Sequence, residues 1–396
     1  MKKEPAGASA VRSGEKATSL RYSLMDLART RGDVIPLGRG DPDLHTPAPI
    51  IDGALERFAR TEVGDVGADD RLRGLSELRR GIADRLRRER AVDVDPESEI
   101  VITNGAQEGL FLAMLALIDP GDRVVCPDPR YTSYDQAIGA AGGAIVTIPT
   151  GGDEPFELSA TSVREYGADA KLLVFVNPSN PTGARVAADG VRELVEVAAE
   201  MDLLVLSDEI YEDVVFDGRP SLSFLAVEGA HERSVLLSGF SKSYAMTGFR
   251  VGYLVGPPDF TGAVAAIKAT TSGACPVFSQ LAALAALEVE EDPRPRYLAI
   301  YEGRRRALLD GFDELAIPYG PHGGGLFVWA DVSRFGIGAE AFCYRLLEET
   351  GVLMFPGNSF GDRWQNWVRV SLLAPEESVT AAIGRIQGFV AGLEQS

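Results

Sequence analysis

The chain is poor in the residues that build disulfide frameworks and metal centres. Its 396 residues include only three cysteines and three histidines, and no two cysteines form a CxxC pair. We therefore expect neither a disulfide framework nor a clustered zinc site, although this count says nothing about metal ligands far apart in the sequence. Cys126 ends an apolar run, and we expect it to lie in the core rather than to act as a nucleophile.

Basic residues are outnumbered as well, and long apolar runs are missing. The 39 lysines and arginines face 58 aspartates and glutamates, which gives a formal net charge of −19. Such a charge repels nucleic acid and is expected mainly to keep the protein in solution. No run of about 18 apolar residues occurs, so no membrane-spanning helix is expected. The first residues, MKKEPAGASAVRSGEK, lack the apolar centre of a signal peptide, and we predict a cytoplasmic location.

What is present is the composition of a globular enzyme with room for two domains. Hydrophobic residues make up 45% of the chain and charged residues 24%, which is ordinary for such proteins. A charged, proline-containing segment, EEDPRPRYL, interrupts the pattern near residue 290. We predict a flexible N-terminal arm, a segment that joins the small domain, a large domain and a small C-terminal domain, at residues 1–18, 19–48, 49–288 and 289–396.

Short apolar runs alternate with helical patterns through the predicted large domain. EIVIT (99–103) is typical of a strand, and residues 104–118 are typical of a helix with Asn104 as its N-cap. Four further segments each combine a strand with a following loop: DRVVCPDPRY, KLLVFVNPSNPTG, DLLVLSDEIY and SVLLSGFSK. This alternation predicts an α/β fold with a mostly parallel, doubly wound sheet. The smaller α+β domain is expected to have strands within 321–332 and 367–373.

Polar motifs follow these strands, at the edge where parallel sheets bind ligands. They are NGAQ (104–107), NPSNPTG (177–183), SDEIY (207–211) and SGFSKSYAMTGFR (238–250). The last motif contains Lys242 and Arg250. Pyridoxal 5'-phosphate (PLP) requires a reactive lysine amine with an arginine, an aspartate, an asparagine and a tyrosine around it, because its aldehyde forms a Schiff base with lysine and its phosphate needs a cation. We therefore predict one shared site for this cofactor.

In this combination and order, the motifs resemble those of the class I/II aminotransferases, which are PLP-dependent enzymes of fold type I. The resemblance covers residues 33–390. It implies that Lys242 forms the Schiff base and moves the proton, that Asp208 pairs with the pyridine nitrogen, and that Tyr131 stacks on the ring. These three residues would be catalytic, and Tyr211 and Asn180 would form hydrogen bonds with the ring oxygen.

The resemblance also implies a phosphate site. Arg250 would hold two phosphate oxygens. The helix expected over residues 104–118 would bind the phosphate as well, through its first backbone N–H groups. These belong to Gly105, Ala106 and Gln107. A serine hydroxyl is also expected, but Gly239 stands where many relatives have that serine. Whether Ser241 or Ser238 takes this role is left open.

For the substrate, the resemblance implies that Arg369 in WVRVSLL binds the α-carboxylate. An arginine inside an apolar strand is costly unless it is paired, and a carboxylate supplies the pairing. The backbone of Gly40 would lie near the same carboxylate. Arg39 beside it either approaches the substrate or lies on the surface. The sequence shows no clear second arginine for a side-chain carboxylate, so a dicarboxylic substrate is neither supported nor excluded.

One position departs from the family pattern. Relatives carry a tyrosine that reaches the phosphate of the neighbouring subunit, and Asp69 stands at that position here. A carboxylate would repel a phosphate at contact distance. Either the loop is shifted or an arginine, Arg71 or Arg73, compensates. Our hypothesis is that this segment is remodelled for an unusual substrate or reaction.

We predict a PLP-dependent aminotransferase with a ping-pong mechanism, in which an amino acid donates its amino group and an α-keto acid collects it. The resemblance implies a homodimer with sites at the interface. The first alternative is another PLP enzyme on the same scaffold, a lyase or cyclase that catalyses β- or γ-elimination or replacement. The second is a noncatalytic ligand-binding or regulatory module. The motifs do not define the amino acid or the keto acid.

Overall fold

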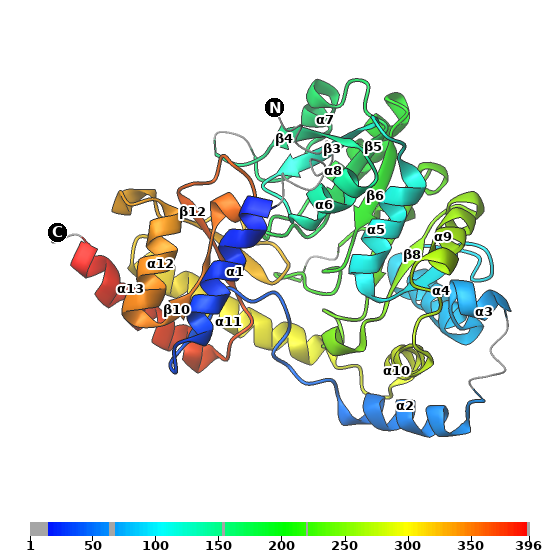
Figure 1. The fold of residues 1–396 in the computed structure, drawn as a ribbon, viewed down its shortest axis with the longest axis horizontal. Helices are drawn as coiled ribbons and strands as arrows, with labels where there is room; N and C mark the ends of the chain where they lie inside the picture. Colours follow the sequence, from blue (N-terminus) through cyan, green and yellow to red (C-terminus); the bar gives the residue numbers. More distant parts are fainter. Residues whose placement is uncertain (1–14, 63–67, 153–154, 219–220, 394–396) are drawn as a thin grey trace, which may run out of the picture.

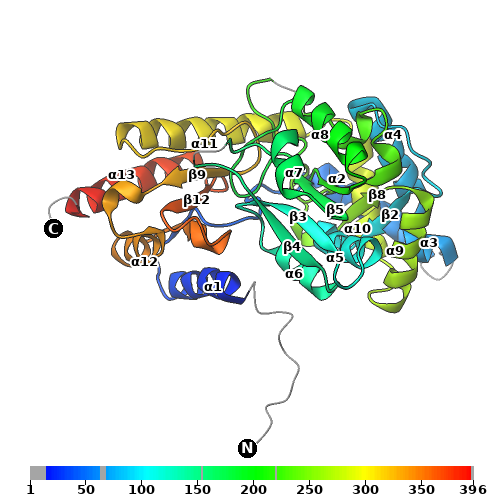
Figure 2. The ribbon, with the colours of Figure 1, turned by 90° about the horizontal axis from the view of Figure 1, so that it is seen from above.

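The computed structural model describes residues 15–62, 68–152, 155–218 and 221–393, which form an α/β fold with a large and a small part (Figure 1). The predicted fold class is confirmed. The small part lies beside one end of the large sheet, and helix α11 (Arg294–Glu314) extends from it toward the large part (Figure 2). Among the described helices, none has both the length and the apolar character that a membrane crossing requires.

The large part is built on a seven-stranded sheet with the order β2-β8-β7-β6-β5-β3-β4. Every neighbouring pair is parallel except the two pairs of β8, which is antiparallel to both β2 and β7. The bounds are β2 Ile100–Thr103, β3 Arg123–Asp128, β4 Ala144–Pro149, β5 Leu172–Val176, β6 Leu204–Asp208, β7 Ser234–Gly239 and β8 Gly252–Val255. The sequence motifs did not reveal β4 and β8.

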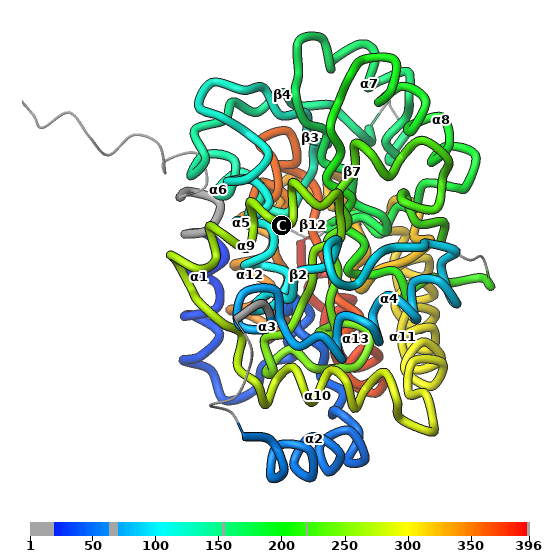
Figure 3. Tube along the Cα trace, turned by 90° about the vertical axis from the view of Figure 1, so that its right-hand side faces the viewer, coloured from blue at the N-terminus to red at the C-terminus, as the bar shows by residue number. Residues whose placement is uncertain are grey.

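Helices cover both faces of this sheet, which explains its continuous apolar strands. In β5, Leu172 and Val174 face one helical layer, whereas Leu173 and Phe175 face the other. The first layer contains α5 (Gly105–Leu117), α6 (Ser133–Ala140) and α9 (Pro258–Thr270). The opposite face is covered by α2 (Ala48–Arg60), α4 (Ser76–Arg90), α7 (Ala160–Tyr166), α8 (Ala188–Glu200) and α10 (Val277–Glu288). Helices α2 and α10 lie side by side at one edge (Figure 3).

Helix α5 begins directly after β2, as predicted, but Asn104 does not cap it with its side chain. The Asn104 amide instead donates to Glu108 Oε1 at 2.8 Å, and its backbone N–H donates to Glu108 Oε2 at 2.6 Å. Glu108 in turn pairs with the buried Lys268. Asn104 is therefore the N-cap residue, as predicted, but its side chain is turned toward the Glu108 carboxylate and forms no capping hydrogen bond. The first-turn N–H groups of α5 are not used by this side chain.

The small part contains a three-stranded antiparallel sheet with the order β11-β12-β9 and a parallel pair of β1 with β10. Strands β9 and β12 lie within the two segments predicted from the sequence. Their bounds, with the other elements of this part, are α1 Glu15–Arg29, β1 Ile35–Pro36, β9 Phe327–Asp331, α12 Ala339–Thr350, β10 Val352–Leu353, β11 Phe355–Pro356, β12 Trp367–Ser371 and α13 Glu376–Leu393.

The N-terminal segment packs against this C-terminal part. Leu24 of α1 and Ile35 of β1 belong to one hydrophobic cluster with β9, β12 and α13. Helix α1 begins at Glu15, so the last residues of the predicted arm are helical, and residues 1–14 lie outside the described range. The predicted domain boundaries themselves stay a prediction.

A buried ionic network holds the segment that follows β6. Arg85 of α4 donates to Glu212 at 2.9 Å and to Asp213 at 2.6 Å, and Arg90 donates to Asp213 at 2.7 Å. Arg294 of α11 also pairs with Asp213. Three cations therefore surround two acids that lie four and five residues after Asp208, the last residue of β6. This network fixes the backbone at the carboxyl end of that strand.

Glu209, buried next to this network, is expected to make stability depend on pH. Burial, and then the nearby Glu212, raise its pKa from 4.5 to about 7. Between these values the folded state holds a proton that the unfolded state has lost, so stability falls as the pH rises from about 4.5 through 7. Glu209→Gln removes this titration and keeps an oxygen acceptor. Relative to the wild type, it should gain up to roughly 3 kcal/mol of stability across this range.

The comparison requires thermal unfolding midpoints of both proteins at several pH values. Glu193→Gln on the exposed face of α8 is the matched control, and it should leave the wild-type pH profile unchanged. Parallel pH profiles for Glu209→Gln and the wild type would show that Glu209 does not titrate in this range.

Candidate active site

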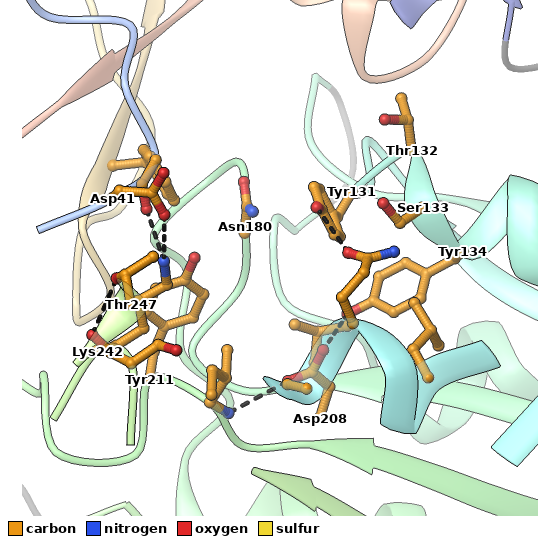
Figure 4. Close-up of a pocket in the computed structure, with 18 of the residues that line it drawn as sticks. Asp41, Tyr131, Thr132, Ser133, Tyr134, Asn180, Asp208, Tyr211, Lys242 and Thr247 are labelled. Atoms are coloured by element: carbon orange, nitrogen blue, oxygen red, sulfur yellow. Dashed lines mark hydrogen bonds and ion pairs between the residues drawn. The ribbon is translucent and has the colours of Figure 1, made fainter. Parts of the chain in front are cut away.

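A cavity of about 480 Å³ lies at the carboxyl ends of the central strands, where the large and small parts meet (Figure 4). It is lined by residues from β5, β6, β12, the start of α5 and the loops after β3 and β7. The predicted site residues in its wall are Gly40, Ala106, Gln107, Tyr131, Asn180, Asp208, Tyr211, Ser241, Lys242, Arg250 and Arg369. The structure thus brings together residues that are distributed over more than 300 positions of the sequence.

Lys242 lies in the loop after β7 and reaches into this cavity (Figure 4). Its amine donates to the carbonyl oxygen of Gly40 at 2.8 Å and contacts Asp41 Oδ1 at 3.3 Å. Its side chain is 14% exposed. Burial lowers the pKa of the amine; Asp41 opposes this shift, and the positive charges of Arg250 and Arg369 add to it. A lowered pKa makes the unprotonated, nucleophilic amine more accessible near neutral pH.

Asp208 is the last residue of β6, and its carboxylate is held by two hydrogen bonds. Tyr134 Oη donates to Oδ2 at 2.6 Å, and the backbone N–H of Ile210 donates to Oδ1 at 3.2 Å. Burial raises the pKa of this carboxyl, and the hydrogen bond from Tyr134 counteracts the shift. Within the described parts of the chain, no cationic side chain pairs with Asp208. A buried carboxylate that is oriented but lacks a counter-ion suits a cationic ligand group.

Tyr131 lies on the same side of the pocket as Thr132 and Tyr134 (Figure 4). Its hydroxyl donates to Gln107 Oε1 at 3.1 Å, and its ring is perpendicular to that of Tyr134, with centroids 5.9 Å apart. These contacts fix the Tyr131 ring in the cavity wall, where it can pack against a flat ligand.

The predicted phosphate residues form a close cradle. Gly105 has φ of +76°, and a Cβ there would lie 2.5 Å from Arg250 Nη2. Only glycine therefore lets the arginine approach the beginning of α5 so closely. Ser241 lines the cavity. Ser238 is buried in β7 and lies 3.5 Å from Glu212, outside the cavity wall. The geometry favours Ser241 for the role left open by the sequence.

Arg369 projects from β12 and is buried. It donates to Asn180 Oδ1 at 3.0 Å and to the Gly38 carbonyl oxygen at 2.9 Å, whereas its Nε has no acceptor among the described residues. Its guanidinium carbon lies 4.0 Å from the centroid of the Phe327 ring. Burial lowers the pKa of Arg369 to about 9, and the charge of Arg21 adds to this effect. The group has no carboxylate partner in the described chain, so the site suits an anion.

Of the two remaining residues considered from the sequence, one lies in the cavity wall and the other does not. Tyr211 is buried in the cavity wall, where its ring packs edge to face on Phe327 at 6.0 Å, and burial raises the pKa of its hydroxyl. Arg39 is exposed and is not part of the cavity wall, which supports the surface role and not an approach to the substrate.

The segment with the family departure lies in α3 (Ala68–Arg73). The side chain of Asp69 lies outside the described part of the structure. Arg73 donates to Thr261 at 3.0 Å and to the Ser98 carbonyl oxygen at 3.2 Å, so it ties α3 to α9. Neither Arg71 nor Arg73 lines the cavity of its own chain. The remodelling hypothesis, which concerns a neighbouring subunit, stays a prediction.

Among the cavity residues that were not selected from the sequence, Tyr134, Asp41 and Arg21 contact or face the predicted site groups. Tyr134 follows Tyr131 by three positions, a spacing that places both near the same helical turn. Arg21 shares one face of α1 with Leu24, which is completely buried. An arginine on the apolar face of a helix is the signal that could have identified it.

The fold and the cavity, with a partly buried lysine amine, a buried carboxylate and a buried arginine in its wall, are typical of an enzyme that holds a charged aromatic cofactor. Comparisons with known proteins agree. The family model "Aminotransferase class I and II" matches residues 32–386. The chain therefore belongs to the class I and II aminotransferases, a family that uses PLP, and it is an aminotransferase.

The individual relatives are named for different substrates. The chain is 31% identical to aromatic-amino-acid aminotransferase 2 of Thermococcus litoralis, over 92% of this chain and 93% of that one. It is 34% identical to the aspartate aminotransferase of Thermotoga maritima, over 95% and 96%. The structure of Thermus thermophilus aspartate aminotransferase with maleate superposes with a TM-score of 0.86, at 30% identity, over 98% of this chain and 99% of that one.

Proposed function

We propose that the cavity binds PLP with its ring nitrogen facing Asp208 and its aldehyde carbon facing Lys242, and that Arg369 binds the α-carboxylate of the substrate. One observation carries this proposal. Asp208 and Arg369 are buried groups of opposite charge that face the same cavity, and neither has an ion-pair partner in the described chain. A pyridinium and a carboxylate supply the two missing partners.

The residues present fit the cofactor. Isolated buried charges are strongly unfavourable, so each needs a counter-ion from the ligand. At the other end, the guanidinium of Arg250 lies against Gly105, so Arg250 and the first-turn N–H groups of α5 are neighbouring candidate donors to a phosphate. Asn180 accepts a hydrogen bond from Arg369 through Oδ1, which leaves its Nδ2 to donate to the ring oxygen. Tyr211 is the second candidate donor to that oxygen.

When bound, PLP supplies an electron-withdrawing ring that stabilises negative charge on the substrate α-carbon. Lys242 binds the cofactor in the resting enzyme, and its amine then carries the proton to and from the α-carbon. Arg369 orients the substrate, because two parallel N–H···O bonds fix the plane of a carboxylate. Asp208 keeps the ring nitrogen protonated. Gly40 and Asp41 hold the lysine amine in place through the contacts described above.

The reaction we propose is a ping-pong transfer between an amino acid and an α-keto acid. Because the chain is an aminotransferase and its relatives are named as aminotransferases, transamination is favoured over a lyase or cyclase reaction on the same scaffold. We also propose a homodimer. Leu55 and Phe58 of α2 are 53% and 41% exposed, and this helix projects at the edge of the molecule (Figure 3), which suits a surface that a second copy covers. A cytoplasmic location stays a prediction.

Titration of the PLP-loaded protein with single amino acids tests the proposed function. The lysine-bound cofactor should absorb visible light, and a true amino donor should remove this absorption without any keto acid present. An α-keto acid should then restore it. Borohydride reduction followed by peptide mapping should place the cofactor on Lys242. A lyase or cyclase would instead turn over without a keto acid, and a protein that shows no absorption after loading with PLP would contradict the proposal.

A further inference from the structure

Helix α1 contributes a second arginine to the active-site cavity. In α1, Leu24 packs into the hydrophobic cluster of the small part, and Arg21, one turn earlier on the same face, lines the cavity together with Met25. The helix lies against α12, and Figure 2 shows it beside the small part. This arrangement holds the arginine at a fixed place at the rim of the site.

Arg21 is held by two contacts, neither of which neutralises it. Its Nη2 donates to Thr132 Oγ1 at 2.5 Å, and its guanidinium carbon lies 5.4 Å from the centroid of the Phe360 ring. Figure 4 shows Thr132 on the side of the pocket opposite Lys242. A guanidinium has five N–H groups, and only the bond to Thr132 is formed with a described residue. No carboxylate in the described chain pairs with Arg21.

The two arginines lie close to each other. The guanidinium carbons of Arg369 and Arg21 lie 4.6 and 5.4 Å from the same Phe360 centroid, so they are at most about 10 Å apart. Of the acidic residues in the cavity wall, Asp41 contacts Lys242 and Asp208 is hydrogen-bonded to Tyr134. The two cations therefore repel each other across the substrate end of the cavity. A ligand with two carboxylates relieves this repulsion at both positions.

We propose that Arg21 binds the side-chain carboxylate of a dicarboxylic amino acid, and of the matching dicarboxylic keto acid, whose α-carboxylate lies on Arg369. This inference rests on the proposed function and names its substrate class. A planar guanidinium matches a carboxylate through two parallel hydrogen bonds. The bond to Thr132 and the contact with Phe360 orient the group in advance, so that little additional ordering is needed on binding. Arg21 is thus a specificity-determining residue in this proposal.

The test compares acids with their neutral, nearly isosteric amides in the PLP-loaded enzyme. The rate at which each amino acid removes the visible absorption gives a specificity constant for aspartate, asparagine, glutamate and glutamine. The wild type should favour the acids over the amides. Arg21→Gln should lower the constants for the acids roughly 10- to 100-fold and leave those for the amides almost unchanged. Arg21→Lys should retain part of the acid preference, because it keeps the charge but loses the planar pair of donors.

A binding measurement without turnover provides a second readout. Maleate, a dicarboxylate that has no amino group to transfer, should bind the wild type more tightly than butyrate, and Arg21→Gln should weaken maleate binding without affecting butyrate. Arg29→Gln is the matched control, because Arg29 lies on the same helix but is exposed and pairs with Asp26. Arg29→Gln should leave the affinity for both ligands unchanged.

The outcomes separate this inference from the proposed function. If Arg21→Gln lowers the specificity constants for acids and amides equally, Arg21 only anchors α1 and the inference is wrong. The inference is also wrong if the wild type transaminates neutral amino acids but does not favour acids. If no amino acid removes the visible absorption, the proposed function itself fails. Thermal unfolding of each variant identifies a loss of folding. If Arg21→Gln does not fold, the ratio of the maleate and butyrate affinities of Arg21→Lys shows whether the cation at position 21 binds the second carboxylate.

Discussion

Lys242→Ala is expected to slow transamination by at least about 10⁴-fold while the protein still folds and binds PLP. The substitution removes the amine that binds the aldehyde and carries the proton. It leaves Asp208, Arg250 and the start of α5 unchanged, so the ring nitrogen and the phosphate keep their partners. Turnover, measured with the best donor found by titration, gives the loss of rate. Retained cofactor, measured after gel filtration, separates this loss from a loss of binding.

Two further variants make this test specific. Lys242→Arg keeps a positive charge beside Asp41 but provides no amine that can react or release a proton at neutral pH, so it should be as inactive as Lys242→Ala. Lys171→Ala is the matched control, because Lys171 lies outside the cavity and pairs with Asp119 and Asp122. It should retain full activity. Near-normal turnover in Lys242→Ala would show that Lys242 does not take part in the reaction.

The parts of the site that could be predicted lie directly after strands that the sequence reveals. The buried runs before Asn180, Asp208 and Lys242 are short and apolar, and parallel strands end at one edge of the sheet. These two features are sufficient to predict that the motifs share one cavity. The strands β4 and β8 were missed because β4 is only partly buried and β8 is a four-residue strand directly after a polar motif.

Residues whose role depends on tertiary packing could not be predicted in the same way. The role of Tyr134 follows from its hydrogen bond to Asp208, and that of Arg21 from its place in the cavity wall, neither of which the sequence specifies. Asn104 holds the predicted N-cap position, but its side chain donates to Glu108, four residues later, and does not cap the first-turn N–H groups. Local patterns predict which residues begin a helix, whereas the hydrogen-bond partners depend on every side chain nearby.

Arg21 also changes the interpretation of the substrate. From the sequence, no second arginine was evident, because the family resemblance begins at residue 33 and Arg21 precedes it. The structure adds a cation at the rim, whereas the departure at Asp69 concerns a different segment, α3, in which neither Arg71 nor Arg73 lines the cavity of its own chain. Substrate selection is therefore better sought in α1 than in α3.

Arg369→Gln is expected to lower the specificity constant for every amino acid by roughly 100- to 3,000-fold, because one partner of a buried, hydrogen-bonded ion pair is lost. Glutamine keeps a donor for Asn180 but has no charge and no pair of parallel N–H groups. The loss should be similar for acids and amides, in contrast to Arg21→Gln, since both classes carry the same α-carboxylate. Specificity constants from the absorption assay measure both effects.

A ligand that binds but cannot react distinguishes carboxylate binding by Arg369 from a purely structural role of this residue. Maleate should raise the thermal unfolding midpoint of the PLP-loaded wild type, because a ligand stabilises the state that it binds. It should leave the midpoint of Arg369→Gln almost unchanged. Arg305→Gln is the matched control, since Arg305 is a partly buried arginine of the small part whose partners are His322 and Asp217. A maleate response in Arg369→Gln equal to that of the wild type would place the carboxylate site elsewhere in the cavity.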